Sequence, residues 1–134
     1  MFLQPKASKF KKTKKGNLSK YEFKSNRLKR GTIGLKCVES GVITARQIEA
    51  ARQAIMRKMD RKGKLWVRIY PYLPITAKPS EVRMGKGKGA VNHWAARVNA
   101  GQIIFEVCGV DLNIVKSAFK TGGAKLPVKV LVFH

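Results

Sequence analysis

The stretch with the clearest capacity for chemistry is residues 83–89, which read RMGKGKG. Three cations are interspersed with three glycines, and the run contains no carboxylate. Glycines let a backbone approach a ligand closely and cations neutralise phosphate oxygens, so the pattern predicts phosphate binding. Arg83 adds a planar fork that can hold a phosphate through two hydrogen bonds or stack on a base. The candidate contacts are Arg83, Met84, Gly85, Lys86, Gly87, Lys88 and Gly89.

The residues that follow this loop argue against a nucleotide site. A Walker A loop needs Ser or Thr directly after its lysine, whereas Lys88 is followed by Gly89 and Ala90. A dinucleotide fold needs a helix after the glycines, whereas residues 90–99, AVNHWAARVN, are patterned as a strand. A nucleic-acid backbone is therefore the favoured source of phosphate. A flexible lid with incidental lysines is the alternative.

Composition points to the same class of partner. Lys and Arg number 29 against 7 Asp and Glu, a formal net charge of +22, which favours a polyanionic partner. The 134 residues suit one domain, and a hydrophobic fraction of 44% allows a packed core. No membrane span or secretory signal is visible. Cys37 and Cys108, without a CxxC motif, are interpreted as small buried residues rather than metal ligands or a disulfide.

The N-terminal residues 1–31 are predicted to form an extended basic arm. Glu22 is the single carboxylate among many lysines and arginines, and no helical or strand period organises the apolar residues. We expect the arm to be disordered when free, to order on a polyanion, and to add RNA affinity rather than stability. The interleaved aromatics Phe10, Tyr21 and Phe23 can stack on bases. A solvated tail or a localisation signal is the alternative.

The clearest helix follows residues 41–43. Thr44 is the predicted N-cap, and Gln47 at the third helical position completes a capping box. Ile43 and Ile48 are spaced as a hydrophobic staple across this start. Gly63 is the predicted left-handed residue after the helix end.

This helix has one apolar face and one basic face. The apolar stripe, which we expect in the core, consists of Ile48, Ala51, Ile55 and Met59. Arg46, Arg57 and Arg61 fall roughly opposite, and few acids interrupt the helix. An ordinary solvated face would mix charges more evenly, so we predict nucleic-acid contact here. A plain solvent-exposed face is the alternative.

The remaining pattern predicts a compact α+β domain over residues 32–134. Strands are expected at TIGLKCV, at KLWVRIY with Leu65, Val67 and Ile69 inward, and at the final VKVLVF. The proline-rich residues 71–81 are expected to form an extended loop without regular pairing. Residues 90–99 and 102–108 are expected to pair as a hairpin. A second helix should start after Asp111 and end at Gly122 and Gly123, which gives a mainly antiparallel sheet with two helices.

No catalytic or metal site is predicted. The seven carboxylates are scattered, and no nucleophile lies beside a base in sequence. His93, next to Trp94, is interpreted as a strand residue at an RNA surface or in the core. We expect no enzyme, no cofactor and no small-molecule substrate.

Several segments together resemble a known family. These are LQPKASKFKKTKKG, ITARQIEAARQAI, GKLWVRIYPYLPIT, EVRMGKGKG, GQIIFEVCGV and AKLPVK. In order and spacing they are similar to the large-subunit ribosomal protein of the L sixteen family, bacterial and organellar type. The resemblance covers nearly the whole chain.

The resemblance implies binding to large-subunit rRNA near the aminoacyl-tRNA site and the peptidyl transferase centre, with roles in tRNA positioning and late subunit assembly. It also implies neighbouring ribosomal proteins as partners, and no membrane. The loop of residues 83–89 would extend toward tRNA and catalytic RNA. By position, the rRNA contacts would be Lys6, Lys9, Lys11, Lys12, Lys14 and Lys15 in the arm and Arg46, Arg52 and Arg57 on the helix. Phe10 and Arg61 join them from the residue patterns above.

Two stretches depart from the family pattern. Residues 17–32, NLSKYEFKSNRLKRGT, replace a segment rich in Arg and Gly, so no contacts are transferred there. The stretch before Trp94 also differs, so His93 receives no family role. The lysine-rich divergence and the ending LVFH are interpreted as mitochondrial, with the plastid and the bacterial cytoplasm as alternatives. A free-standing RNA chaperone or another nucleic-acid-binding protein is the alternative function.

Overall fold

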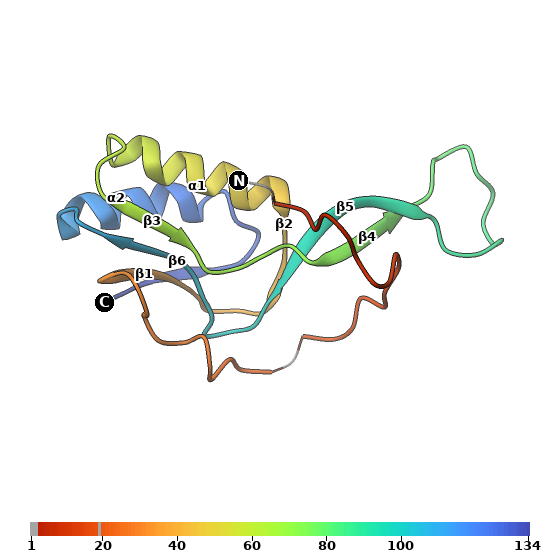
Figure 1. Ribbon diagram of the computed structural model, residues 1–134, viewed down its shortest axis with the longest axis horizontal. Helices are drawn as coiled ribbons and strands as arrows, with labels where there is room; N and C mark the ends of the chain where they lie inside the picture. Colours follow the sequence, from red (N-terminus) through yellow and green to blue (C-terminus); the bar gives the residue numbers. More distant parts are fainter. Residues whose placement is uncertain (1–2, 19) are drawn as a thin grey trace.

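The computed structural model describes residues 3–18 and 20–134 (Figure 1). Residues 1, 2 and 19, which belong to the predicted arm, lie outside the described residues. The elements are β1 Ile33–Cys37, β2 Gly41–Thr44, α1 Ala45–Lys58, β3 Lys64–Val67, β4 Leu73–Ala77, β5 Ala90–Val98, β6 Ile103–Cys108, α2 Leu112–Gly123 and β7 Val130–Phe133. Two helices and two antiparallel sheets confirm the α+β prediction.

The larger sheet carries the hydrophobic core. Its strand order is β3-β6-β1-β7, with antiparallel neighbours throughout. Helices α1 and α2 lie together on one face of it (Figure 1). The stripe of Ile48, Ala51, Ile55 and Met59 is buried in this core, as predicted. Burial of these side chains, together with Phe105 and Phe119 from the sheet and α2, holds the two layers together.

The smaller sheet forms a projecting finger. Its order is β2-β5-β4, and β4 and β5 extend away from the core to carry residues 78–89 at their tip (Figure 1). The proline-rich residues 71–81 were expected to lack regular pairing, and that prediction is wrong for β4. Pro74 pairs with Trp94 of β5 and is buried. Proline is tolerated because β4 lies at the sheet edge, where a missing N–H breaks no ladder on its outer side.

The predicted hairpin between residues 90–99 and 102–108 is also wrong. β5 pairs with β2 and β4, whereas β6 pairs with β1 and β3 in the other sheet. Residues 99–101 are therefore a corner between two sheets, where Gly101 takes a φ of 89°. Strand β2 was not predicted, and the last strand begins at Val130 rather than residue 128.

Both helix starts agree with the prediction, and both ends differ from it. Thr44 and Gln47 form the capping box, and Asp111 caps α2 by accepting from the N–H of Asn113. α1 ends earlier than Gly63: Asp60, with a φ of 51°, is the first left-handed residue after the cap. The N–H of Asp60 donates to the carbonyl oxygen of Arg57 and that of Arg61 to the carbonyl oxygen of Met56, which satisfies two carbonyls in the last turn of α1.

The end of α2 differs for a packing reason. Gly122 and Gly123 were predicted to stop the helix, but both belong to it, and its C-cap is Ala124. Gly122 is buried against α1, where an added Cβ would lie 2.4 Å from the Ile55 side chain. This glycine therefore allows the two helices to approach closely.

Candidate nucleic-acid interface

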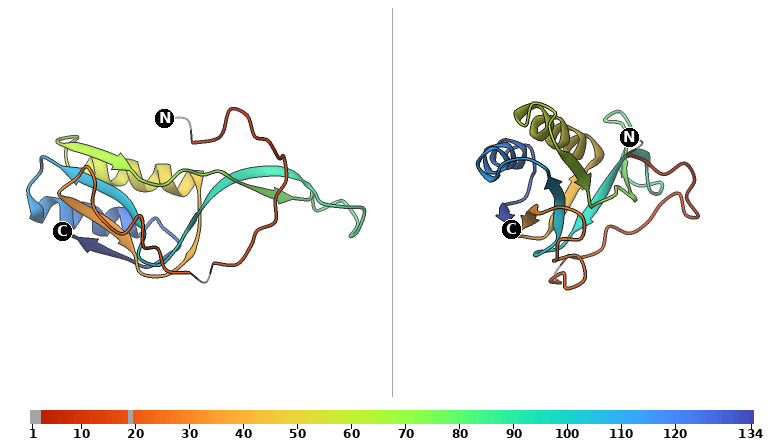
Figure 2. Two further views of the ribbon diagram at one scale, coloured as in Figure 1. Left: turned by 60° about the horizontal axis from the view of Figure 1, so that its bottom comes forward. Right: turned by 60° about the vertical axis from the view of Figure 1, so that its left-hand side comes forward.

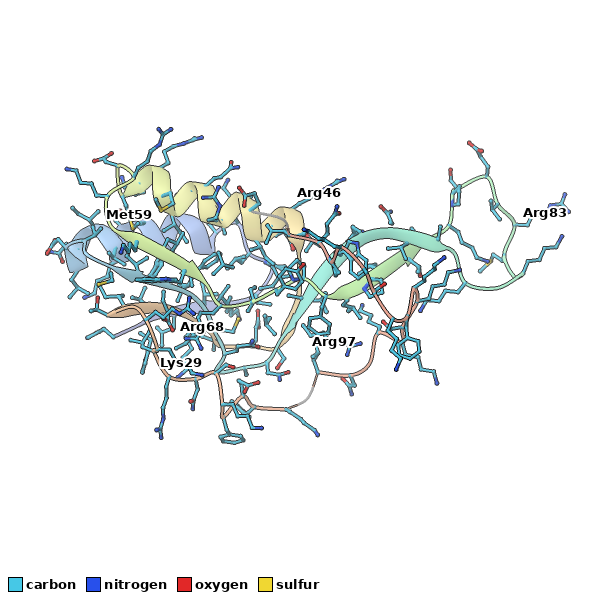
Figure 3. All side chains as sticks on the ribbon, viewed as in Figure 1. Lys29, Arg46, Met59, Arg68, Arg83 and Arg97 are labelled. Atoms are coloured by element: carbon cyan, nitrogen blue, oxygen red, sulfur yellow. The ribbon has the colours of Figure 1, made fainter. Side chains whose placement is uncertain are left out.

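The loop of residues 83–89 lies at the far tip of the finger, where the side chain of Arg83 points into solvent (Figure 3). Residues 83–88 are all exposed, and Met84 is 99% exposed. Gly85 and Gly87 have positive φ values of 93° and 85°, and a Cβ on either would meet nothing within 4 Å. The tip of the loop thus has open space around Gly85 and Gly87.

The base of the loop is packed more tightly. Gly89 is half-buried beside β4, and a Cβ there would lie 2.3 Å from the carbonyl oxygen of Ala77. Lys78 Nζ donates to the carbonyl oxygen of Gly85. The glycine at the base is therefore required by the close approach of two strands, while those at the tip face open space.

The N-terminal arm crosses this finger (Figure 2). Lys12 Nζ donates to the Lys88 carbonyl oxygen at 2.8 Å, and Lys88 Nζ donates to the Thr13 carbonyl oxygen. Arg97 of β5 donates from Nη2 to the carbonyl oxygen of Lys14 at 2.6 Å. These contacts place the arm's lysines beside the base of the loop, so two segments predicted separately from sequence form one basic surface.

The basic face of α1 is spread along the helix rather than gathered at the loop. Arg46 and Arg57 of α1 are exposed. Arg61 is also exposed, but it follows the end of α1 with a φ of 59°, so it is not on the helix as predicted. Arg46 lies at the finger end of α1, whereas Met59 marks the opposite end (Figure 3). The predicted residues Arg57 and Arg61 are therefore not brought together with Arg83.

Arg52 differs from the other arginines of this face. It is half-buried and forms an ion pair with Glu49, with Nη2 and Oε1 2.6 Å apart. The hydrogen bond from Arg52 lowers the pKa of Glu49 below its ordinary value. Much of the charge of Arg52 is thus already matched within the helix.

Arg46 also borders a hollow next to the finger. Thr44, Ala45 and Arg46 line it from the start of α1, and Asn92, His93 and Trp94 line it from β5, around about 290 Å³. His93 is half-buried there. This position fits a strand residue at a basic surface better than a core residue.

A second basic segment, residues 27–31, was not predicted as a site. Its backbone is held by Glu106 of β6, which is fully buried. The carboxylate accepts from the backbone N–H groups of Lys29 at 3.2 Å, Arg30 at 2.8 Å and Gly31 at 3.0 Å. Arg68 of β3 pairs with the same carboxylate, and its side chain is 15% exposed. These contacts with the core argue against the expectation, for residues 29 and 30, that residues 1–30 contribute RNA affinity rather than stability.

The electrostatics of Glu106 follow from these partners. Burial raises the pKa of its carboxyl, but the N–H groups of Gly31, Arg30 and Lys29 and the charge of Arg68 together lower it below the ordinary value. Glu106 is therefore ionised in the folded protein. In the sequence, Glu106 could have been found as a lone acid within the apolar run IIFEVC, in a chain with few acids.

The division into an arm of residues 1–31 and a domain of residues 32–134 stays a prediction.

Other chemistry has little support in the described ranges. Cys37 is buried, and burial, with a smaller contribution from Glu39, raises the pKa of its thiol to about 12. Cys108 is half-buried and also free. Across residues 3–18 and 20–134, no three His, Cys, Asp or Glu side chains are grouped to hold a metal. Neither helix of that part of the chain is long and apolar enough to cross a membrane.

Comparison with known proteins identifies the family. Residues 5–133 match the family described as Ribosomal protein L16p/L10e. The chain is 55% identical over 132 residues to "Large ribosomal subunit protein uL16" of Methylorubrum extorquens, covering 98% of this chain and 96% of that protein. It is 53% identical to the Caulobacter vibrioides protein of the same name, covering 97% and 91%. The corresponding figures for Bartonella bacilliformis are 54%, 95% and 93%.

These relatives correct one interpretation and confirm another. They are bacterial, so the mitochondrial assignment is not supported and the bacterial cytoplasm is favoured over it. The match along almost the whole chain confirms the resemblance drawn from the motifs. The chain belongs to the ribosomal protein L16p/L10e family, and it is a structural component rather than an enzyme.

Proposed function

We propose that this protein is a structural constituent of the large ribosomal subunit that binds large-subunit rRNA. The observation that carries the proposal is the joint basic surface of arm and finger, where Lys12, Lys88 and Arg97 tie the two segments together. Each of these bonds is accepted by a backbone carbonyl rather than a carboxylate, so the positive charge of the surface is not cancelled. Such a surface attracts nucleic-acid phosphates at low energetic cost.

The assignment to the large subunit rests on the family. The relatives are named as proteins of that subunit, and the chain matches them over nearly its full length. Neighbouring ribosomal proteins are the expected protein partners. The proposed further rRNA contacts are Lys6, Lys9, Phe10, Lys11, Lys14, Lys15, the exposed Arg46 and Arg57 of α1, and Arg61 after this helix.

The finger has a more specific proposed role. Its tip is an exposed cationic segment distant from the core, and Gly85 and Gly87 give it freedom to follow a ligand. The resemblance to the family supports the proposal that this loop extends toward aminoacyl-tRNA and the peptidyl transferase centre. We infer that it supports tRNA positioning there and that it does not bind free nucleotides.

The loop is tested with two variants in purified large subunits. Arg83→Ala removes the guanidinium fork, and Gly87→Val restricts the backbone without removing a charge. Both variants should fold and join subunits, and both should slow single-turnover peptide-bond formation. Lys120→Ala, which removes an exposed charge on α2, is the matched control and should react at the parental rate. Parental rates for both loop variants would contradict the tRNA role.

Sedimentation separates this function from the alternative. A ribosomal constituent should sediment with large subunits in sucrose gradients at moderate salt. A free-standing RNA chaperone should be found mainly near the top of the gradient. Detection by mass spectrometry across the fractions decides between the two.

A further inference from the structure

Residues 21–31 are fixed on the open face of the larger sheet, the face that the helices do not cover (Figure 1). The carbonyl oxygen of Ser25 accepts from the N–H of Ile103 at 3.0 Å. Leu28 packs over Gly34 of β1, where an added Cβ would lie 2.7 Å from the Leu28 Cδ2 atom. The segment is thus held by β1 and β6 at several points.

Three cations near the end of residues 21–31 point away from the sheet. Arg27, Lys29 and Arg30 are exposed, whereas the Leu28 between them is half-buried against the sheet. Glu106 binds the backbone N–H groups of residues 29–31 and leaves the side chains of Lys29 and Arg30 free of that bond. The fold therefore sets the backbone on which these cations are displayed.

Their charges are not matched by acids. In the ranges 3–18 and 20–134, the ion pairs are Arg52 with Glu49 and Arg68 with Glu106. Arg68 neutralises Glu106, so that carboxylate does not offset Lys29 or Arg30. Glu22, the acid nearest in sequence, accepts from the backbone N–H groups of Lys24 and Ser25 instead.

We propose that Arg27, Lys29 and Arg30 form a further binding strip for RNA backbone phosphates, with Glu106 as its positioning residue. The strip belongs to the end of the arm but is separate from residues 12–14, which contact the finger. In Figure 3 Lys29 and Arg46 of α1 lie on opposite sides of the molecule. The protein would thus contact RNA on the open face of its sheet as well as on the helical side. This inference rests on the proposed binding to rRNA and adds a second surface to it.

Salt titration of binding tests the strip. The full-length parent and the triple variant Arg27→Ala, Lys29→Ala, Arg30→Ala are titrated against purified large-subunit rRNA. Loss of three phosphate contacts should lower the slope of log affinity against log salt by about 2–3. The matched control Lys116→Ala, Lys120→Ala, Lys125→Ala removes equal charge from α2 and the turn after it, and should change the slope by less than about 1.

The outcomes distinguish failure of the proposed function from failure of the proposed strip. If the parent itself does not bind the rRNA, the proposed function is wrong. If the parent binds and both triple variants lower its slope equally, the effect is one of net charge and the strip is overturned. An unchanged slope in the strip variant, with a parent that binds, also overturns it.

The role of Glu106 needs a variant that keeps all three cations. Glu106→Gln removes the charge that holds the backbone of residues 29–31. It should speed hydrogen exchange at the N–H groups of Lys29, Arg30 and Gly31 and weaken rRNA binding roughly tenfold. Faster exchange with parental affinity would show that Glu106 does not position the strip.

A second variant controls for a loss of affinity that is caused by destabilisation of Glu106→Gln. Removing one partner of a buried ion pair can destabilise a fold, whereas replacing both partners by neutral groups is better tolerated. Glu106→Gln with Arg68→Met is therefore measured in the same way, after circular dichroism confirms that it is folded. It should show the same loss of affinity, and parental affinity would overturn the positioning role.

Discussion

Residues 29–31, Lys-Arg-Gly, and residues 86–88, Lys-Gly-Lys, have almost the same composition and opposite surroundings. The backbone of the first is held by the buried carboxylate of Glu106, and a Cβ on Gly31 would lie 2.8 Å from backbone atoms of Val107. In the second, Gly87 has a φ of 85°, and a Cβ added there would meet nothing within 4 Å. The two segments thus have almost the same local composition, and their surroundings differ because a buried acid lies beneath residues 29–31.

This difference has a consequence for binding. A segment whose backbone is already fixed loses little conformational freedom when it meets a ligand, so its cations bind at a lower entropic cost. Residues 85–88 are held by lysine side chains at the carbonyl oxygens of Gly85 and Lys88, so a ligand must order them further, but they can follow an irregular surface. We infer that the protein uses fixed cations on the sheet and adaptable ones at the finger tip.

Removal of the buried acid is the strongest test of this comparison. Glu106→Ala removes a fully buried carboxylate and leaves the largely buried Arg68 and the backbone N–H groups of residues 29–31 without their partner. Breaking a buried pair in this way should lower the free energy of unfolding by about 3–5 kcal/mol. Urea denaturation of the free protein measures it.

The control is an acid beside the other segment. Glu81 is exposed near the finger tip, so Glu81→Ala should change the free energy of unfolding by less than about 0.5 kcal/mol. Similar losses in both variants would show that residues 29–31 are no more firmly held than the loop.

A methyl group added at Gly31 should have the next largest effect. The Cβ of Gly31→Ala would lie 2.8 Å from the Glu106 Cβ and from the backbone N and O of Val107. Because the backbone of β6 cannot yield easily, we expect a loss of about 1–3 kcal/mol in the free energy of unfolding. A neutral result in urea denaturation would mean that residues 29–31 can lift from the sheet at little cost.

The features that could be predicted from the sequence are those with local causes. The capping box of Thr44 and Gln47 and the stripe through Ile55 depend on residues within a few turns, and both are confirmed. The exposed loop at residues 83–88 is likewise a property of its own glycines and cations. These features needed no knowledge of the rest of the chain.

The wrong predictions depended on distant partners. Pro74 argued against a strand, but its place at the edge of a sheet beside Trp94 made the strand possible. Residues 90–99 and 102–108 looked like a hairpin, and only the separate partners of β5 and β6 exclude it. The contact between Glu106 and residues 29–31 spans more than seventy residues, so no local pattern could reveal it.

Lowering the pH should destabilise the protein through protonation of the Glu106 carboxylate, which holds residues 29–31. The pKa of Glu106 is lowered below the ordinary value of 4.5, so the folded protein binds this proton less tightly than the unfolded chain. Its contribution to stability is therefore present above about pH 4.5 and is lost as the pH falls further. The urea midpoint of the parent should fall more steeply below that pH than the midpoint of Glu106→Gln.

Other acids with lowered pKa values do not affect the comparison of urea midpoints between the parent and Glu106→Gln. The pKa values of Glu22 and Glu49 are also lowered, chiefly by the backbone N–H of Lys24 and by Arg52 respectively. Both remain in the parent and in the variant, so the difference between the two acid titrations isolates Glu106. Parallel titrations would show that the Glu106 carboxylate contributes nothing to stability through its charge.

The smallest effect is expected at the finger tip. Alanine in a left-handed conformation costs about 1–2 kcal/mol when the backbone is held there, and Gly87 has such a conformation. The tip has no packing neighbours at this position, so in Gly87→Ala the backbone can relax and the strain need not persist. We expect a change in the free energy of unfolding below about 0.5 kcal/mol, together with unprotected N–H exchange at residues 85–88 in the parent. A loss as large as that of Gly31→Ala in the same urea experiment would mean that the tip packs against the free protein, and the contrast between the two segments would then fail.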